Sequence, residues 1–315
     1  MRKKILDTPL FPELTAPTSA PRRNRKKLGI PKGLDLDQYE RAEDGRLREI
    51  VGSWSTIKHR VLFEYVGRTR GIRKNWISKG PAGATYIDLF SGPGEVRIEN
   101  TKEVLPGSPL VVWNNRGFGP FTQVYVADLH PDLVLDCHAR LQEAGAPVDR
   151  IEGEADTTVD EVIARIDEKS FHFAFLDPFN LGSLSFDVIR KLARLRSIDI
   201  LVHVSAQDLN RNLRRYIEKE GSSLDRFAPG WRGKVDTSLA DPAVRTAIFR
   251  YWTSLIKTLK GMLVAEAMQL VSGDEGQPLY WLAFVSRHAL GHKFWKAIQP
   301  PPDPEPGLLF TRLPS

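Results

Sequence analysis

The chain has little of what would build a disulfide, a thiolate metal site or a membrane span. Its 315 residues include a single cysteine, Cys137, which excludes an intramolecular disulfide and any site with several thiolate ligands within the chain. No stretch approaches the roughly 20 apolar residues that a membrane-spanning helix needs. No apolar run of signal-peptide length follows the charged start. We therefore expect a cytoplasmic protein without a membrane segment.

The composition is typical of a globular protein with a modest positive charge. Hydrophobic residues make up 41% of the chain and charged residues 27%, and the formal net charge is +6. This excess weakly favours an anionic partner such as nucleic acid. Part of it comes from the basic run at 22–27, within a proline-rich segment, 1–35, that we interpret as a flexible arm. The arm either contacts phosphates or is simply a solvated tail.

The rest of the chain alternates between strand and helix patterns. The pattern becomes helical at about residue 36, and a long helix is expected at 55–79, capped by Ser55 or Thr56. Strands are expected at 85–90, 123–127, 149–152, 172–176, 199–204, 262–267 and 279–285. Helices are expected between them, at 109–115, 131–144, 158–167, 186–195 and 243–258.

This alternation predicts an α/β, Rossmann-like domain. We expect a seven-stranded, mostly parallel sheet with helices on both faces and one antiparallel strand, formed by the last two strands as an edge hairpin. That is the pattern of class I methyltransferases. The single domain would cover 36–298, with a helical or loop insertion at about 207–240 and a C-terminal tail at 299–315.

The first chemical motif is the segment 88–94, Asp-Leu-Phe-Ser-Gly-Pro-Gly, at the end of the first strand. Glycines after a buried strand allow a sharp turn and a close approach of the backbone to a ligand. We therefore predict that the segment grips a nucleotide-like cofactor, through Asp88, Phe90, Ser91, Gly92 and Gly94. The alternative is a plain tight turn.

The glycine segment does not run directly into its helix, because residues 95–106 intervene. The helix is expected to begin with Ser108 as N-cap and Pro109 at its first position. Its N-terminus would then not abut the glycine segment. This weighs against NAD or FAD, whose pyrophosphate uses that contact, and suits the cationic S-adenosylmethionine. The intervening loop is either a lid over the site or a surface excursion.

Acidic residues follow the next two strands. Asp128 ends the second strand, where a carboxylate can accept hydrogen bonds from both ribose hydroxyls. Asp156 follows the third strand, where a side chain would meet the adenine amino group. Each has an alternative role as the cap of the helix that comes next. We interpret both as cofactor-binding residues.

The segment 177–180, Asp-Pro-Phe-Asn, follows a strand that is apolar on both faces. Asp177 would stand near the transferable methyl group, and Phe179 can stack on a planar acceptor. Methyltransferases that act on base amino groups use a similar acidic-Pro-Pro-aromatic element. One proline is missing here, so base methylation is only suggested, and Asp177 as a general base toward another acceptor is the alternative.

Basic residues near this edge are candidates for substrate binding. Arg211, Arg214 and Arg215 follow the fifth strand at helical spacing, either as a phosphate-binding face or as a solvated one. Lys58 and His59 on the early helix are further candidates. His288 and His292 lack a third ligand, so we expect no metal site, and we expect Cys137 to be a small core residue.

Together these elements resemble the family of three-Cys-motif partner proteins (TcmP). The matching elements are Lys58-His59 with Tyr65, and the segments 86–94, 107–110, 175–179, 211–213 and 279–284, followed by Trp295. The resemblance implies a methyltransferase-like fold of bacterial or phage origin. It also implies a partner protein with a three-cysteine motif, similar to a radical-S-adenosylmethionine iron–sulfur centre, which would suit a chain with one cysteine. Many relatives have Gly where this chain has Asn180, which bears on the shape of the acceptor pocket.

Two functions follow from these motifs. The first is an S-adenosylmethionine-dependent methyltransferase that acts on nucleic acid together with the three-cysteine partner. The alternative is a non-catalytic accessory module of the same fold that recognises nucleic acid for that partner. An NAD-dependent oxidoreductase is disfavoured, because the chain lacks a Gly-x-Gly-x-x-Gly segment here.

Overall fold

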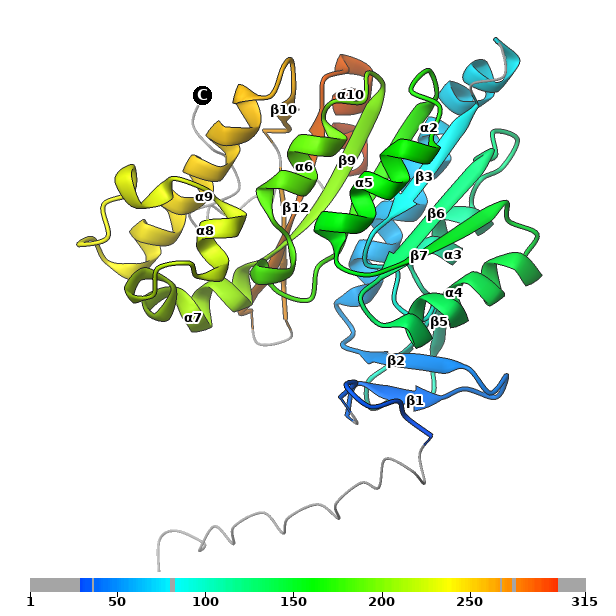
Figure 1. Cartoon of the computed structure of the whole chain (residues 1–315), viewed down its shortest axis with the longest axis horizontal. Coiled ribbons are helices and arrows are strands. Elements are labelled where there is room, and N and C mark those ends of the chain that lie inside the picture. Colours follow the sequence, from blue (N-terminus) through cyan, green and yellow to red (C-terminus); the bar gives the residue numbers. More distant parts are fainter. Residues whose placement is uncertain (1–28, 36, 80–82, 267, 274–275, 300–315) are drawn as a thin grey trace, which may run out of the picture.

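A large central sheet with helices on both faces forms most of the molecule, and a smaller sheet lies at one end of it (Figure 1). The computed structural model describes residues 29–35, 37–79, 83–266, 268–273 and 276–299. The predicted basic run at 22–27 and nearly all of the predicted tail lie outside the described residues.

The central sheet has the strand order β10-β12-β9-β8-β3-β6-β7, with β11 also paired to β12. The strands are β3 (Ala84–Asp88), β6 (Gln123–Asp128), β7 (Val148–Glu152), β8 (Phe171–Leu176), β9 (Ile198–Ser205), β10 (Leu263–Val264), β11 (Gln269–Ser272) and β12 (Pro278–Ser286). The five strands from β7 to β9 are parallel, and β12 runs antiparallel to β9.

One edge of this sheet consists of two short strands, β10 and β11, of which β11 was not predicted. β10 pairs with one end of β12 and β11 with the other, both antiparallel, so the two together fill one edge position. The sheet therefore has seven strand positions and one antiparallel strand between parallel neighbours. The α/β, Rossmann-like fold of class I methyltransferases is confirmed.

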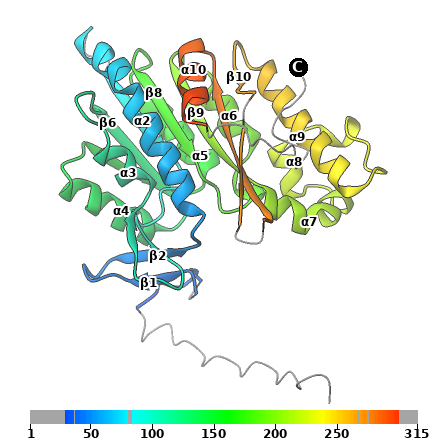
Figure 2. The ribbon, with the colours of Figure 1, turned by 180° about the vertical axis from the view of Figure 1, so that it is seen from behind.

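Helices cover both faces because the strands are apolar on both sides, as in β8, all six of whose residues are buried. One face carries α2 (Ser55–Ser78), α3 (Ser108–Asn114), α4 (Pro131–Glu143) and α10 (Ala289–Ile298), which face the viewer in Figure 2. The other carries α5 (Ala155–Arg165), α6 (Phe186–Leu192), α7 (Ala206–Glu218), α8 (Ser223–Phe227) and α9 (Asp241–Thr258). The segment predicted as an insertion at 207–240 consists of α7, α8 and the short η2 (Trp231–Gly233).

The small sheet corrects the prediction of a helical pattern from residue 36. Residues there form the hairpin of β1 (Tyr39–Arg41) and β2 (Leu47–Val51). The intervening loop after the glycine segment forms a second hairpin, β4 (Glu95–Ile98) and β5 (Val104–Pro106), and β4 pairs in parallel with β2. The first hairpin is thus stabilised by a partner far away in sequence, which a local pattern does not reveal.

Two predicted helix caps are also wrong. The N-cap of α2 is Trp54 rather than Ser55 or Thr56, and the N-cap of α3 is Gly107 rather than Ser108. Neither cap residue makes a side-chain hydrogen bond to its helix. Among the described residues, no helix is both long and apolar enough to cross a membrane.

Candidate functional site

The site lies at the carboxyl edge of the central sheet, where the loops after β3, β6, β8 and β9 meet. In open α/β sheets this is the edge at which ligands bind. Gly92 and Gly94 in the loop after β3 have φ values of 56° and 84°, a left-handed conformation that strongly favours glycine. The Ser91 backbone N–H donates to the Ala127 carbonyl oxygen at 2.9 Å, which fixes the loop against β6. The predicted glycine loop is therefore an ordered turn between two strands.

Asp88, the last residue of β3, stabilises this loop through hydrogen bonds to its carboxylate. Its carboxylate is fully buried and accepts hydrogen bonds from the Tyr86 hydroxyl at 2.9 Å, the Ser108 hydroxyl at 2.8 Å and the Phe90 backbone N–H at 3.1 Å. Burial raises the pKa of Asp88 to about 7, although these three bonds favour the charged form. All three donors belong to the protein and the carboxylate is fully buried, so Asp88 fixes the loop that would hold a cofactor.

The intervening hairpin does not separate the glycine loop from its helix, contrary to the sequence prediction. The Gly107 backbone N–H donates to the Gly94 carbonyl oxygen at 2.8 Å. A Cβ on Gly107 would lie 2.8 Å from the Gly94 carbonyl carbon. The chain therefore leaves at Gly94 and returns to the same point, and the N-terminus of α3 abuts the loop. The argument against NAD from a displaced helix is accordingly lost.

Asp128, at the end of β6, keeps capacity for a ligand. One carboxylate oxygen accepts from the Gly92 N–H and the other from the His130 N–H, both at 3.0 Å. A carboxylate can accept about four hydrogen bonds, and the Leu129 backbone N–H also bonds to this one, so acceptor capacity for a hydroxyl is left. Burial raises the pKa of Asp128. Its position suits the predicted ribose role.

Asp156 stands in a different environment, in the first turn of α5. Its carboxylate forms an ion pair with Arg226 of α8 and accepts a hydrogen bond from the Ser185 hydroxyl. These contacts join α5 to the helices beside it. The adenine role of Asp156 stays a prediction, and it requires that these partners be shared or released.

The small sheet borders the glycine loop. Glu49 of β2 brings its Oε2 to 3.5 Å from the point that a Cβ on Gly92 would occupy. Burial raises the pKa of Glu49 to about 7, and Lys58 opposes that rise. Arg140 of α4 ties the parts together, because its guanidinium donates to the carbonyl oxygens of Leu47 and Pro93, both at 2.7 Å. No sequence motif marked Glu49 as a site residue.

A cluster of ionisable side chains surrounds Asp177, directly after β8. The Lys58 ammonium lies 2.5 Å from Asp177 Oδ2, and His203 Nδ1 lies 3.6 Å from Oδ1. Burial opposes the charge of Asp177, but Lys58 and then His203 outweigh it and hold its pKa below the usual range. Burial likewise opposes the charge of Lys58, whose pKa is nevertheless raised by Asp177 and Glu49. The predicted pair Asp177 and Lys58 is therefore an ion pair.

Two imidazoles in this cluster are neutral at physiological pH. Burial lowers the pKa of His203 to about 4 and that of His59 to about 3. The His203 ring packs on Tyr280 of β12 with a centroid separation of 4.4 Å, and the Tyr280 hydroxyl donates to the Trp54 carbonyl oxygen at 2.9 Å. Within the described residues, Nδ1 of each histidine has no hydrogen-bond partner. His203 was missed from the sequence because it lies inside an apolar strand.

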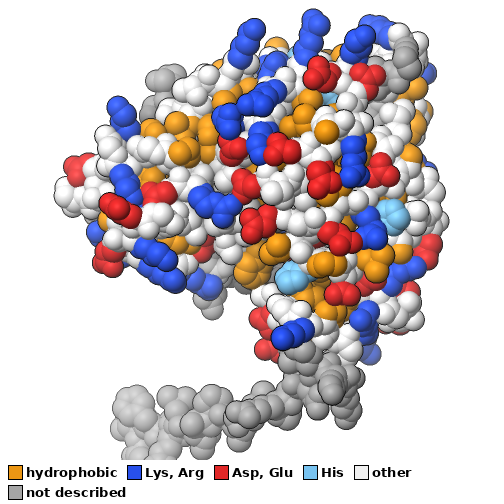
Figure 3. All heavy atoms as spheres, in the orientation of Figure 1, with side chains coloured by type: hydrophobic (Ala, Val, Ile, Leu, Met, Phe, Trp, Pro, Cys, Tyr) orange, Lys and Arg blue, Asp and Glu red, His pale blue; other side chains and the backbone are white. Residues whose placement is uncertain are grey.

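The aromatic residue after Asp177 points outward, since Phe179 is 74% exposed. Arg211, Arg214 and Arg215 on α7 are exposed as well, but they do not act as one set. Arg214 forms an ion pair with Asp241, whereas the other two form none with any described residue. On the face shown in Figure 3, positive and negative side chains are interspersed, and positive ones gather over α7.

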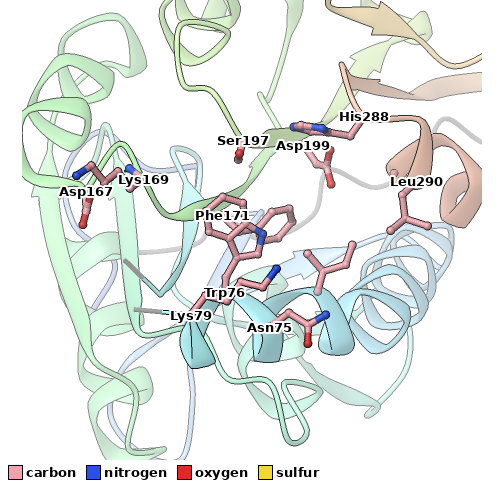
Figure 4. A pocket seen from close by; sticks show the side chains of 12 residues that line it. Asn75, Trp76, Lys79, Asp167, Lys169, Phe171, Ser197, Asp199, His288 and Leu290 are labelled. Carbon is pink, nitrogen blue, oxygen red and sulfur yellow. Dashed lines mark hydrogen bonds between the residues drawn. The ribbon is translucent and has the colours of Figure 1, made fainter. Parts of the chain in front are cut away.

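A cavity lies at the opposite edge of the sheet (Figure 4). It has a volume of about 720 Å³ and is lined by Trp76 of α2 and Lys79 directly after it, by Phe171 and Asp199 at the starts of β8 and β9, and by Leu290 of α10. Asp199 accepts a hydrogen bond from the Tyr65 hydroxyl at 2.6 Å. These are the amino ends of the strands, so this cavity is separate from the glycine loop. Cys137 is buried behind Gly94, as predicted for a core residue.

Of the comparisons with known proteins, only the comparison with solved structures found matches. No family model matches the chain, and no curated protein matches it either. The resemblance to three-Cys-motif partner proteins therefore stays a prediction.

Three of these solved structures show how similar they are to this chain in sequence and in fold. The protein LPL1258 from Legionella pneumophila, of family DUF519, is 10% identical, with 75% of this chain and 89% of that chain covered and a TM-score of 0.45. The O-methyltransferase from Bacillus cereus in complex with SAH is 13% identical, with 70% and 79% covered and a TM-score of 0.40. Cofactor-bound Rv0187 from MTB is 16% identical, with 76% and 82% covered and a TM-score of 0.40. These likenesses are too distant to assign a cofactor or an activity.

Proposed function

We propose that the protein is an S-adenosylmethionine-dependent methyltransferase that acts on nucleic acid. One observation carries the proposal. The glycine loop with Asp128 and the cluster of Lys58, Asp177 and His203 lie at the same sheet edge, in a fold of the class I methyltransferase type. A cofactor loop and an acid–base cluster side by side are what a group-transfer enzyme needs.

The residues of the loop fit the cofactor chemically. Asp128 accepts backbone hydrogen bonds and keeps acceptor capacity for a ribose hydroxyl. Backbone groups from Phe90 to Gly94 would hold the amino-acid part, because the two glycines leave the surface free of Cβ atoms. Asp88 contributes by fixing that loop, and Asp156 remains the candidate for the adenine amino group.

When bound, the cofactor supplies a methyl group on a sulfonium, and the protein has to position the acceptor and take its proton. His203 suits proton acceptance because its imidazole is neutral. Asp177 would orient that imidazole through Nδ1, at a distance of 3.6 Å that closes to a hydrogen bond in the productive complex. Lys58 keeps Asp177 charged. The acceptor's lone pair would take the methyl group, S-adenosylhomocysteine would leave, and the acceptor's proton would pass to His203 Nε2.

Nucleic acid is the acceptor class that the surroundings favour. Phe179 is exposed beside Asp177 and can stack on a base, and Arg211 and Arg215 are exposed cations without an acidic partner among the described residues. His59 stays a candidate for contact with the acceptor. The three-cysteine partner protein and the cytoplasmic location rest on the sequence alone.

The test combines binding and transfer. We expect S-adenosylhomocysteine to bind the full chain in calorimetry, and labelled methyl groups to pass from S-adenosylmethionine to RNA or DNA. His203→Gln should retain the binding and lose the transfer. If S-adenosylhomocysteine binds tightly and RNA or DNA binds as well, but no labelled product forms, the result would support the accessory module instead. Binding of NAD but not of S-adenosylhomocysteine would overturn the proposal.

A further inference from the structure

A polar cavity of about 330 Å³ lies on the acceptor side of the site. It is lined by Asn180 from the turn after Phe179, by the segment of α7 and the residue after it that carries Asp208, Asn212, Arg215 and Lys219, and by the start of α8. Asn212 and Arg215 come from α7 and Lys219 directly follows that helix, so the C-terminal part of α7 and the residue after it form its wall. The cavity begins one residue beyond the exposed ring of Phe179.

The side chains that line this cavity carry more positive than negative charge. Arg215 and Lys219 form no ion pair with any described residue. Nearby cations differ, since Arg214 is paired with Asp241, Arg226 with Asp156 and Arg232 with Asp225. Because most guanidiniums of this helical region have an acidic partner, two free cations on one cavity wall indicate a place for an external anion.

The one acidic residue of the cavity is already satisfied. Asp208 accepts hydrogen bonds from the Leu181 backbone N–H at 3.0 Å, the Asn212 side-chain amide at 2.7 Å and the Tyr216 hydroxyl at 2.9 Å. It holds the turn after β8 and two residues of α7 in place. Both of its carboxylate oxygens are thereby occupied by groups of the cavity wall. The positive charges of Arg215 and Lys219 stay available to a ligand.

The amide of Asn180 adds a donor. Its Oδ1 accepts from the backbone N–H of Ser183 at 3.0 Å and from the Ser183 hydroxyl at 3.2 Å. Because the carbonyl side of the amide is occupied, the NH₂ side is the one left for a ligand. Asn180, which stands where many three-Cys-motif partner proteins have Gly, would therefore supply a hydrogen-bond donor to a ligand in the cavity. Two cations and an amide donor form a set that phosphate oxygens match.

We infer that this cavity binds a backbone phosphate of the acceptor strand, next to the base that stacks on Phe179. The inference rests on the proposed function and deepens it. The phosphate sits between Arg215 and Lys219, and the target nucleotide extends over Phe179 toward Asp177. Contacts to phosphate position a nucleic acid without reading its sequence. The cavity therefore fixes the distance from backbone to reacting atom.

The experiment measures strand binding without requiring methyl transfer. Fluorescein-labelled single-stranded RNA and DNA of about 12 nucleotides are titrated with the full chain in the presence of S-adenosylhomocysteine. The variant is Arg215→Glu with Lys219→Glu. The matched control is Arg250→Glu with Lys257→Glu, two residues of α9 that form no ion pair with any described residue. Both variants change the net charge equally, so a general loss of attraction affects both.

We expect the cavity variant to bind about tenfold more weakly than the control variant. Its slope of log affinity against log salt should fall by about 1.4, which corresponds to two phosphate contacts on a single strand at about 0.7 each. The conservative exchange Arg215→Lys with Lys219→Arg should keep most of the binding, and thermal unfolding of each variant checks that it folds.

Equal affinity and equal salt slope in the cavity and control variants would overturn the inference. If the cavity variant loses strand binding while the wild-type protein transfers no methyl group, the phosphate site stands and the enzymatic function fails. If transfer to nucleic acid proceeds and the cavity variant matches the control, the function stands and the phosphate site fails. Competition with AMP separates a mononucleotide from a strand: AMP that displaces the strand only at millimolar concentration supports the strand.

Discussion

The ion pair of Lys58 and Asp177 gives the sharpest test of the site, through the substitution Lys58→Met. Methionine keeps the length of the side chain and removes its charge. The two side chains are only 18% and 14% exposed. Removal of one partner of a buried pair costs about 3–5 kcal/mol, because the other charge is left without compensation. Given the remaining exposure of both groups, we expect a loss of about 2–3 kcal/mol in the free energy of unfolding at neutral pH.

The pH dependence of that loss identifies its cause. In the wild-type protein the pKa of Asp177 is lowered, so its contribution to stability is present above the unfolded pKa and disappears as the pH falls through the folded value. Without Lys58, burial is left as the main influence and raises that pKa. The penalty should then be full at pH 7 and shrink as the pH falls toward about 4, where a protonated Asp177 needs no partner.

Urea unfolding, followed by tryptophan fluorescence at both pH values, measures this difference. Lys257→Met, on the exposed face of α9, serves as the control and should change stability by less than about 0.5 kcal/mol. In the double variant with Asp177→Asn, the pair is removed as a whole, and we expect recovery to within about 1 kcal/mol of the wild type. A loss in Lys58→Met below about 1 kcal/mol, equal at both pH values, would refute the ion pair.

Three further predictions address the loop and the base. Ser108→Ala removes a donor from the buried Asp88 carboxylate, so we expect a loss of about 1–3 kcal/mol in urea unfolding and weaker binding of S-adenosylhomocysteine; unchanged values would refute the contact. Gly107→Ala forces a Cβ against the glycine loop and should cost about 1–3 kcal/mol, whereas Gly71→Ala, which has open space within α2, should add about 0.5–1 kcal/mol; similar effects of both would contradict the close approach. If His203 accepts the proton, the rate of methyl transfer should stay constant as the pH falls from 8 to about 5 and decline near its pKa of about 4; a decline centred near 6.5 would point to another base.

The sequence predicted the central sheet because its signals are local. The run 171–176 is apolar throughout except for His172, and such a run predicts a strand buried on both faces whatever its partners are. The acids that end strands, Asp88, Asp128 and Asp177, were found for the same reason, since the carboxyl ends of parallel strands share one edge. Prediction failed where the structure depends on pairing between distant segments. The hairpin at 39–51 exists as part of a sheet completed by 95–98, and nothing within either segment shows the other.

His203 marks the limit for individual site residues. It lies in a strand that is otherwise apolar from Ile200 to Val204, and such strands are assigned by their hydrophobic run. A polar residue that interrupts a run buried on both faces was itself a signal, because burial of an imidazole costs free energy unless something compensates. Asp199, on the same strand, is a second interruption, and it accepts hydrogen bonds from Tyr65 and Ser286. Asp199 contacts both α2, through Tyr65, and the neighbouring strand β12, through Ser286, whereas His203 faces Asp177 in the loop after β8 and packs on Tyr280 of β12.

The elements before the first strand of the central sheet complete the site. Lys58 comes from α2 and Glu49 from β2, whereas a Rossmann-like sheet with its own helices contributes only the acid and the imidazole. Tyr65, two turns after Lys58, donates to Asp199 at 2.6 Å in the core, which fixes the position of α2 along β9. Since β9 carries both Asp199 and His203, the same strand that anchors the helix also presents the imidazole to Asp177. The distance between Lys58 and His203 across the acid is therefore set by buried contacts, which makes this cluster rigid.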